Sequence, residues 1–240
     1  MKLKFLGTRG EIDLRTRLHR MHSSLEISYR EHTLMIDCGA DWVRKIQRMR
    51  PEAIVLTHAH PDHACGLKRG APCEVYATPE TWRSIDEFPI SDRVSIKPRR
   101  PFKVHDMTLE AFPVEHSIRA PAVGYRITAG RSTIFYVPDL VYIYEAHEAL
   151  SGICLYVGDG ASLRRPIIRK RGSALVGHAA IRTQLGWCGR EGVPKTLITH
   201  GGSEIVGGDS RIVGRIVRDL GLERDVSAQI AFDGLEVVLP

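Results

Sequence analysis

The stretch Ile54–Leu67, IVLTHAHPDHACGL, places three histidines and an aspartate within six positions, directly after an apolar run. Imidazole and carboxylate are the ligands that zinc and other borderline divalent ions prefer. An HxH step on extended backbone aims two imidazoles at one point. If Pro61 opens a short helix, Asp62 and His63 aim at a second point close by. The spacing therefore predicts two neighbouring metal sites where a strand ends, rather than a polar loop of solvated histidines.

The composition of the whole chain is that of an ordinary globular protein. Of its 240 residues, 43% are hydrophobic and 26% are charged, and the longest apolar runs fall short of the roughly 20 residues that span a bilayer. We expect a single domain over residues 1–240 and no membrane segment. The first residues, MKLKFLGTRG, lack the features of a secretory signal, which favours the cytoplasm. The five cysteines form no CxxC pair and predict neither a disulfide framework nor a zinc finger.

Strand-like segments and helical patterns alternate along the chain. The predicted strands are KLKFLG, LEISY, TLMID, AIVLT, EVYAT, RVSIK, MTLEAFPV, VGYRIT and STIFYV. Helical patterns cover residues 41–49, 179–192 and 209–221, with Asp41 and either Asp209 or Ser210 as N-caps and Gly221 as a stop. Hairpins mixed with crossover helices predict two sheets covered by outer helices.

Several segments together resemble one known family. THAHPDHACGL resembles the HxHxDH signature of the metallo-β-lactamase-fold hydrolases, and MKLKFLGTRG is similar to the opening hairpin of that family. TLMIDCGAD resembles its strand ending in a D-C-G turn, and three later segments resemble its third, fourth and fifth motifs: PVEHSIRAPAVGYRI, STIFYVPDL and PKTLITHGG. The resemblance covers nearly the whole chain. It implies an α/β fold built as a four-layer αββα sandwich, with two mixed sheets flanked by helices.

The resemblance also implies two divalent metal ions and nominates their ligands. Zinc is favoured by the many histidines, although manganese and iron fit the same ligand set. One ion would be held by His58, His60 and His116, the other by Asp62, His63 and His200, and Asp139 would bridge both. One departure concerns the fourth motif, in which Pro138 stands where the family usually has glycine before the aspartate.

His178 resembles a histidine of the tRNase Z-like branch, which includes a cyclic phosphodiesterase. In that branch a comparable histidine assists the phosphate and the leaving group. We expect His178 at the start of a helix, where free N–H groups favour negative charge, and simple capping of that helix is the alternative. Asp159 resembles the acidic residue that follows the fourth motif, and we expect it to orient a ligand imidazole through the second ring N–H.

A basic segment lies between Asp159 and His178. Its five cations, within eight positions, are Arg164, Arg165, Arg169, Lys170 and Arg171. By resemblance this segment borders the active-site cleft, where it would bind phosphates flanking a scissile bond; a solvated surface is the alternative. The net charge of +6 and pI near 9.2 agree with an anionic partner such as RNA or DNA.

These observations favour a dinuclear metal-dependent phosphodiesterase or nuclease. Two ions would lower the pKa of a bridging water and give a hydroxide, which Asp62 would orient toward a phosphodiester. His178 would stabilise the transition state or protonate the leaving oxygen. The rivals are a hydrolase of esters, thioesters or lactams on the same metal cradle, and a nucleic-acid-binding module without catalysis. The oligomeric state stays open, and only the resemblance suggests a homodimer.

Overall fold

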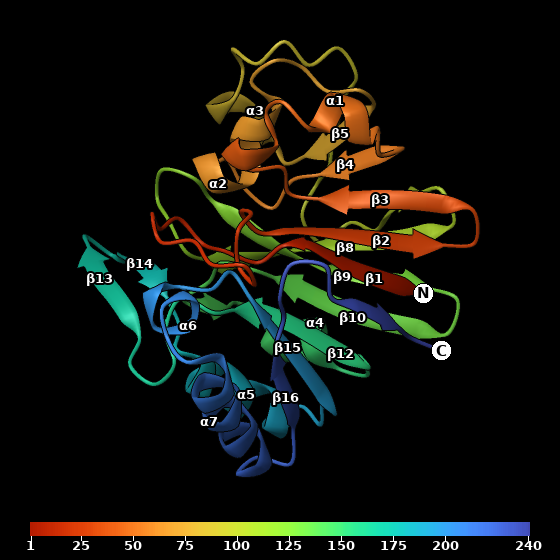
Figure 1. Cartoon of the computed structure of the whole chain (residues 1–240). Helices are drawn as coiled ribbons and strands as arrows, with labels where there is room; N and C mark the ends of the chain where they lie inside the picture. The colour runs from red at the N-terminus through yellow and green to blue at the C-terminus, as the bar shows by residue number, and fades with distance from the viewer.

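Two large β-sheets lie face to face in the computed structural model, which describes all of residues 1–240 (Figure 1). The first sheet has seven strands in the order β17-β1-β2-β3-β4-β5-β6. Its strands are β17 (Glu236–Val238), β1 (Lys2–Gly7), β2 (Ser24–Tyr29), β3 (His32–Ile36), β4 (Ala53–Val55), β5 (Glu74–Ala77) and β6 (Arg93–Ser95). The nine strands predicted from the sequence all exist in the two sheets.

The second sheet has eight strands in the order β11-β8-β9-β10-β12-β15-β16, with β7 paired to β8. Its strands are β7 (Phe102–Val104), β8 (Met107–Glu115), β9 (Ala122–Ala129), β10 (Ser132–Val137), β11 (Tyr142–Ile143), β12 (Leu155–Asp159), β15 (Lys195–Thr199) and β16 (Ser227–Ile230). Both sheets are mixed, because antiparallel hairpins are followed by parallel strands in each.

Helices cover the outer face of each sheet, so the chain forms four layers (Figure 1). The first sheet carries η1 (Ala40–Trp42), α1 (Ile46–Met49), α2 (Pro61–Ala64), η2 (Cys65–Leu67) and α3 (Pro79–Ser84). The second carries α4 (Ala146–Leu150), α5 (Ile181–Arg190), α6 (Ser203–Val206) and α7 (Ser210–Leu222). This arrangement confirms the expected αββα sandwich. None of these helices has both the length and the apolar sequence that a membrane span requires.

Three separate buried clusters fill the three spaces between these layers. Phe5 and Leu34 of the first sheet pack with Tyr125 and Val157 of the second in the central cluster. The outer clusters pack helical side chains, such as Trp82 and Leu185, onto the far face of each sheet. Because each fully buried apolar side chain contributes about 1.5–3 kcal/mol, these clusters fix the two sheets relative to each other.

The parallel strands of both sheets run toward the same edge of the sandwich. In the first sheet β3 to β6 are parallel, and in the second β10, β12, β15 and β16 are parallel. Strand β4 is buried along its whole length, as its continuous apolar sequence requires between two parallel neighbours. The loops that follow the carboxyl ends of such strands are the usual place for a binding site in α/β proteins.

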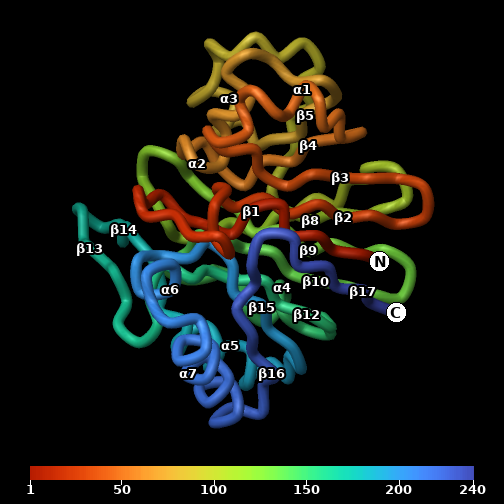
Figure 2. Tube along the Cα trace, in the orientation of Figure 1, coloured from red at the N-terminus to blue at the C-terminus, as the bar shows by residue number.

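A separate two-stranded hairpin projects beside this edge (Figures 1 and 2). It consists of β13 (Ile167–Arg171) and β14 (Ala174–His178), and every residue of β13 is exposed. These two strands were not predicted from the sequence, because their alternation of apolar and polar residues is weak and neither strand packs on the core. Most of the basic segment lies in this hairpin.

Three expectations about helix ends were wrong. His178 is the last residue of β14, and α5 begins only at Ile181, so His178 neither caps a helix nor lies at a helix start. Asp41 lies inside η1 instead of capping it, because its carboxylate pairs with Arg9 at 2.6 Å. The predicted stop, Gly221, is still helical and buried, since it packs against the chain returning to β16. The N-cap of α7 is Asp209, one of the two predicted.

Candidate metal centre and active site

The histidine-rich stretch follows β4 after Leu56 and Thr57 and then turns into a short helix. His60 has extended backbone and precedes α2, which Pro61 opens as the sequence predicted. The extended step places His58 and His60 side by side, and the first turn of α2 carries Asp62 and His63. The side chains of His58 and His63 are completely buried. This short segment thus directs two histidines, His58 and His60, toward one point and directs Asp62 and His63 toward another.

The other candidate ligands arrive from the second sheet. His116 follows β8, Asp139 lies two residues beyond the end of β10, and His200 directly follows β15. His200 has a left-handed backbone (φ 52°) and its ring lies against Gly10, where an added Cβ would be only 2.9 Å from the ring. Glycine is therefore required at this close approach.

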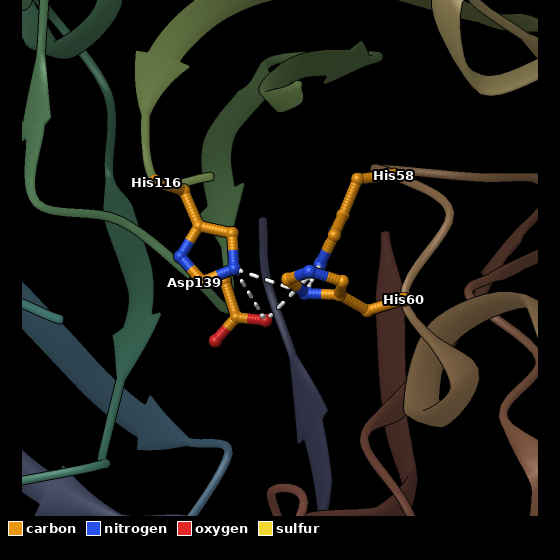
Figure 3. A group of neighbouring side chains, drawn as sticks. All are labelled: His58, His60, His116 and Asp139. Atoms are coloured by element: carbon orange, nitrogen blue, oxygen red, sulfur yellow. Dashed lines mark hydrogen bonds and ion pairs between the residues drawn. The ribbon is translucent and has the colours of Figure 1, made fainter. Parts of the chain in front are cut away.

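The first group consists of His58, His60, His116 and Asp139. Figure 3 shows the imidazoles of His58 and His60 entering from one side, and His116 and Asp139 from the other. His60 Nδ1 lies 3.0 Å from His58 Nε2 and 3.2 Å from His116 Nε2. Asp139 Oδ2 lies 3.3 Å from the same nitrogen of His58. Each residue offers one ligand atom, and these atoms all lie within 4.8 Å of one another.

The second group consists of Asp62, His63, His200 and, again, Asp139. Asp62 Oδ2 lies 3.0 Å from His200 Nε2 and 3.2 Å from His63 Nε2. Asp139 places one oxygen 2.9 Å from His63 Nε2 and the other 3.0 Å from His200 Nδ1. The structure therefore brings all seven predicted ligands into two adjoining groups that share Asp139.

Neighbouring groups fix the free ring nitrogens of three of these histidines. The Thr57 hydroxyl donates to Asp37, so its oxygen accepts from His58 Nδ1 at 3.0 Å. His116 Nδ1 donates to the Gly177 carbonyl at 2.9 Å, and His63 Nδ1 donates to Asp37 at 2.9 Å. The Nε2 atoms of His58 and His116 are thus left as lone pairs facing His60, an arrangement typical of metal-ligating imidazoles.

Three buried polar atoms at the centre of the site have no hydrogen-bond partner: His63 Nε2, Asp139 Oδ1 and His200 Nδ1. Each nitrogen lies near a carboxylate oxygen, and the oxygen lies near an imidazole nitrogen, but the geometry of these contacts is not that of a hydrogen bond. Buried polar atoms without partners are rare in native proteins and require an explanation. All three belong to the second group, where a divalent cation would satisfy them. In the first group, the lone pairs of His58 Nε2 and His116 Nε2 face His60 Nδ1, and a cation there would bind them. The residues present therefore fit the two expected ions.

The charges of the site also fit cations. Burial lowers the pKa of His58, His60 and His116, that of His60 to about 4, which leaves the imidazoles neutral and able to bind a metal. Burial alone would also lower the pKa of His63, but the carboxylates of Asp62, Asp37 and Asp139 raise it well above its ordinary value. This concentration of carboxylates is what divalent ions would neutralise.

His178 lies next to both groups without belonging to the predicted ligand set. Its Nδ1 donates to Asp159 Oδ2 at 2.8 Å and lies 3.3 Å from Asp139 Oδ1. Burial lowers its pKa, but the negative charge of Asp159, reinforced by Asp139, raises it to about 10. Asp159 is completely buried, and the imidazole closest to it is that of His178. The other carboxylate oxygen of Asp159 lies 3.7 Å from the ligand candidate His200.

A cavity of about 1010 Å³ opens over both groups. Arg164 and Arg165 line it together with His178, whereas Arg169, Lys170 and Arg171 lie farther along the hairpin and do not. The expectation that all five cations border the cavity was therefore wrong for the last three. Pairing within β13 and β14 draws them away from the body of the protein.

The hairpin and the loop before it are anchored to the site by groups that sequence reasoning missed. Glu204 of α6 accepts the Leu163 N–H at 3.0 Å and so holds the loop that carries the two cavity-lining arginines. The Gly177 N–H donates to the His116 carbonyl. The φ of Gly177 is +129°, and an added Cβ would lie 1.8 Å from the Ile167 carbonyl oxygen, so no other residue fits at this position.

Asp37, which accepts from the ligand candidate His63, was also missed. Its place in the TLMIDCGAD segment was a signal that could have identified it.

Comparison with known proteins places this arrangement in a family. The profile of the beta-lactamase superfamily domain matches residues 32–200, which contain all candidate ligands. The chain belongs to the beta-lactamase superfamily. Among curated members, a Ribonuclease Z from Methanococcus aeolicus is 30% identical over 152 residues, covering 52% of this chain and 46% of the relative. The chain thus spans about half the length of the curated relatives it matches.

Solved structures of the superfamily agree on the fold. A metallo-β-lactamase-fold protein from Bacillus subtilis superposes with a TM-score of 0.75 at 15% identity, over 98% of both chains. The short form of human tRNase Z superposes with a TM-score of 0.68 at 16% identity, over 100% of both chains. These likenesses support the metallo-β-lactamase fold over the full length of the chain.

Proposed function

We propose that this protein is a metal-dependent phosphodiesterase of the nuclease type, with RNA as the first substrate to test. One observation carries the proposal: His178, held by Asp159, faces the same cavity as both ligand groups and two arginines. A proton donor beside a metal centre and fixed cations match a phosphodiester, whose cleavage needs charge neutralisation and a leaving-group proton. The partial similarity to a Ribonuclease Z supports RNA among polyanions.

Two divalent ions, most suitably zinc, are part of this proposal. His58, His60 and His116 would hold one, Asp62, His63 and His200 the other, and Asp139 would contribute an oxygen to each. Bound there, the ions would supply Lewis-acid chemistry, lowering the pKa of water and neutralising phosphate oxygens.

The chain itself would position the reactants. Asp62 lines the cavity, so a carboxylate oxygen can accept a hydrogen bond from the attacking water and orient it. His178 Nδ1 is engaged by Asp159, which leaves Nε2 as the proton donor toward the leaving oxygen. Arg164 and Arg165 would bind the phosphates on either side of the scissile bond.

Both rival functions fit the site less well. A hydrolase of esters, thioesters or lactams would have no need for two arginines in the cavity or for a histidine and aspartate pair outside the ligand groups. A catalytically inactive nucleic-acid-binding module would not need to retain all seven ligand candidates in two converging groups with unpartnered buried atoms.

A substrate panel tests the proposed function directly. We expect metal-reconstituted protein to hydrolyse RNA and bis-p-nitrophenyl phosphate, and to leave p-nitrophenyl acetate and a chromogenic lactam intact. DNA and cyclic nucleotides in the same panel define the substrate class. Hydrolysis of the acyl substrates alone would support the carbonyl-hydrolase rival. Salt-sensitive RNA binding with less than one metal ion per chain would support the binding module.

The two arginines of the cavity should contribute to substrate binding rather than to chemistry. We expect Arg164→Ala together with Arg165→Ala to raise KM for RNA with kcat nearly unchanged. Each lost phosphate contact should reduce the slope of log affinity against log salt by about one unit. Steady-state kinetics at several salt concentrations measure both effects.

A matched pair of cations gives the control. Arg44 and Arg48 are also exposed, but they lie in the helical layer that covers the first sheet. Replacing both with alanine removes the same charge from the protein and should leave KM and the salt slope close to those of the unchanged protein. Equal effects of the two double variants would assign the salt dependence to net charge and remove the arginines from the substrate site.

A further inference from the structure

A second cluster of metal-ligand side chains lies at the opposite ends of the strands. His32 opens β3, Glu52 immediately precedes β4, and His105 lies in the turn between β7 and β8. The candidate metal centre follows the other ends of β4 and β8, and β8 alone spans roughly 30 Å. The turn between β2 and β3 and the hairpin beside the centre project on opposite sides in Figure 1. The cluster is thus independent of the site described above.

Three ligand atoms converge in this cluster. Glu52 Oε2 lies 3.1 Å from His32 Nδ1 and 3.7 Å from His105 Nε2, and all three atoms lie within 4.8 Å of one another. Zinc binds nitrogen and oxygen at about 2.0–2.2 Å, so two ligands at tetrahedral angles are about 3.3 Å apart. The spacing of the free cluster is therefore already close to that of a bound one.

The Glu52 carboxylate and the two turns that carry the histidines are positioned without a metal. The Thr33 N–H donates to Glu52 Oε2 at 3.1 Å and fixes the carboxylate. His105 has a left-handed backbone (φ 51°), an unfavourable conformation that sets its ring against His32. Arg30 and Asp106, the neighbours of these histidines in the two turns, form an ion pair at 2.9 Å. The two turns are thus tied together independently of the cluster.

The rings of His32 and His105 are stacked, with centroids 4.2 Å apart and planes within 5°. Both present a nitrogen edge to the same carboxylate oxygen. A moderate rotation of each ring about χ2 would aim both lone pairs at one point. The side chains can rotate in this way because they remain 39% and 33% exposed. Solvent would supply the remaining ligand.

We propose that His32, Glu52 and His105 form a surface site for a borderline divalent cation of the zinc or nickel class. A bound ion would link the turn between β2 and β3 to the turn between β7 and β8, and so connect the two sheets. Its contribution is to stability, because it lies at the far end of the strands from the candidate active site.

Nickel titration of protein that already carries its resident ions tests this site. The variants are His105→Asn, which removes the imidazole but tolerates the left-handed backbone, and Glu52→Gln, which keeps the shape of the carboxylate. We expect unchanged protein to bind one more Ni²⁺ per chain than either variant, with a rise in Tm that the variants lack. Phosphodiester hydrolysis by the variants should equal that of the unchanged protein.

His147→Asn is the matched control. His147 forms another exposed pair, with Glu191 at 2.7 Å, but has no third ligand beside it. The His147→Asn variant should bind as much nickel as the unchanged protein. Equal nickel binding and equal Tm shifts in the unchanged protein, His105→Asn and Glu52→Gln would overturn the proposal and leave the cluster as a stacked polar pair. Because this readout needs no substrate, its failure is separate from failure of the proposed function.

Discussion

Asp139→Asn should remove both bound metal and hydrolysis, with a loss of activity of more than about 10²-fold. Replacement of groups that merely support metal ligands costs 10–100-fold, and a shared ligand should cost more. Asparagine keeps the shape of the side chain but lacks the negative charge and one of the two oxygens. Asp139 Oδ2 lies 3.3 Å from His58 of the first group and 2.9 Å from His63 of the second, and Oδ1 lies 3.0 Å from His200 of the second. Elemental analysis and RNA hydrolysis measure the two losses.

The control for this substitution is the same chemical change outside the site. Asp209 caps α7 by accepting the N–H groups of Arg211 and Ile212, and asparagine is an equally good N-cap. Asp209→Asn should therefore retain metal, activity and stability. If Asp139→Asn kept full metal content and normal turnover, the shared position of this residue between the two groups would have no role in metal binding.

The placement of the candidate ligands could be predicted best where these residues are close together in the chain. The HxHxDH segment needs only local geometry: extended backbone for two histidines, and one helical turn opened by Pro61. The strands that precede the outlying ligands were also readable from apolar periodicity. The departure at Pro138 has no visible consequence for placement, since Asp139 still reaches both groups.

Features that depend on tertiary contacts could not be predicted in the same way. Asp37 is completely buried and accepts hydrogen bonds from Thr57 and His63. Both partners lie twenty or more positions away in the chain, so no local pattern identifies them. The hairpin after Asp159 is stabilised by its attachment to β8, where the Leu175 N–H donates to Glu115 at 2.7 Å. The sequence pattern of this part of the chain indicates only an irregular basic segment.

The position of His178 illustrates the same limit with a functional consequence. A helix was predicted to begin at this residue because helical sequence follows it directly. The structure continues β14 through His178 and starts α5 three residues later, since Gly177 pairs with β13 and with His116. His178 therefore does not lie at a helix N-terminus, and in the proposed function its imidazole itself would interact with the substrate.

Two roles for this imidazole make different predictions about the leaving group. A proton donor matters most when the leaving oxygen is a poor leaving group, such as a ribose hydroxyl, and matters little for p-nitrophenolate, which leaves without a proton. A group that only stabilises charge on the phosphate would affect both substrates alike. The hydrogen bond from Nδ1 to Asp159 at 2.8 Å leaves Nε2 free in a side chain that lines the cavity, which favours the first role.

We expect His178→Ala to reduce kcat for RNA by roughly 10²–10⁴-fold, the usual contribution of general acid catalysis. The same variant should lose far less on bis-p-nitrophenyl phosphate. Its metal content should be unchanged because the seven proposed ligands do not include His178, although His178 also lies close to Asp139, Asp159 and His200. Asp159→Asn should show the same substrate dependence in weaker form, since it orients the imidazole. Equal losses on both substrates would favour charge stabilisation, and unchanged RNA hydrolysis with metal bound would exclude His178 from catalysis.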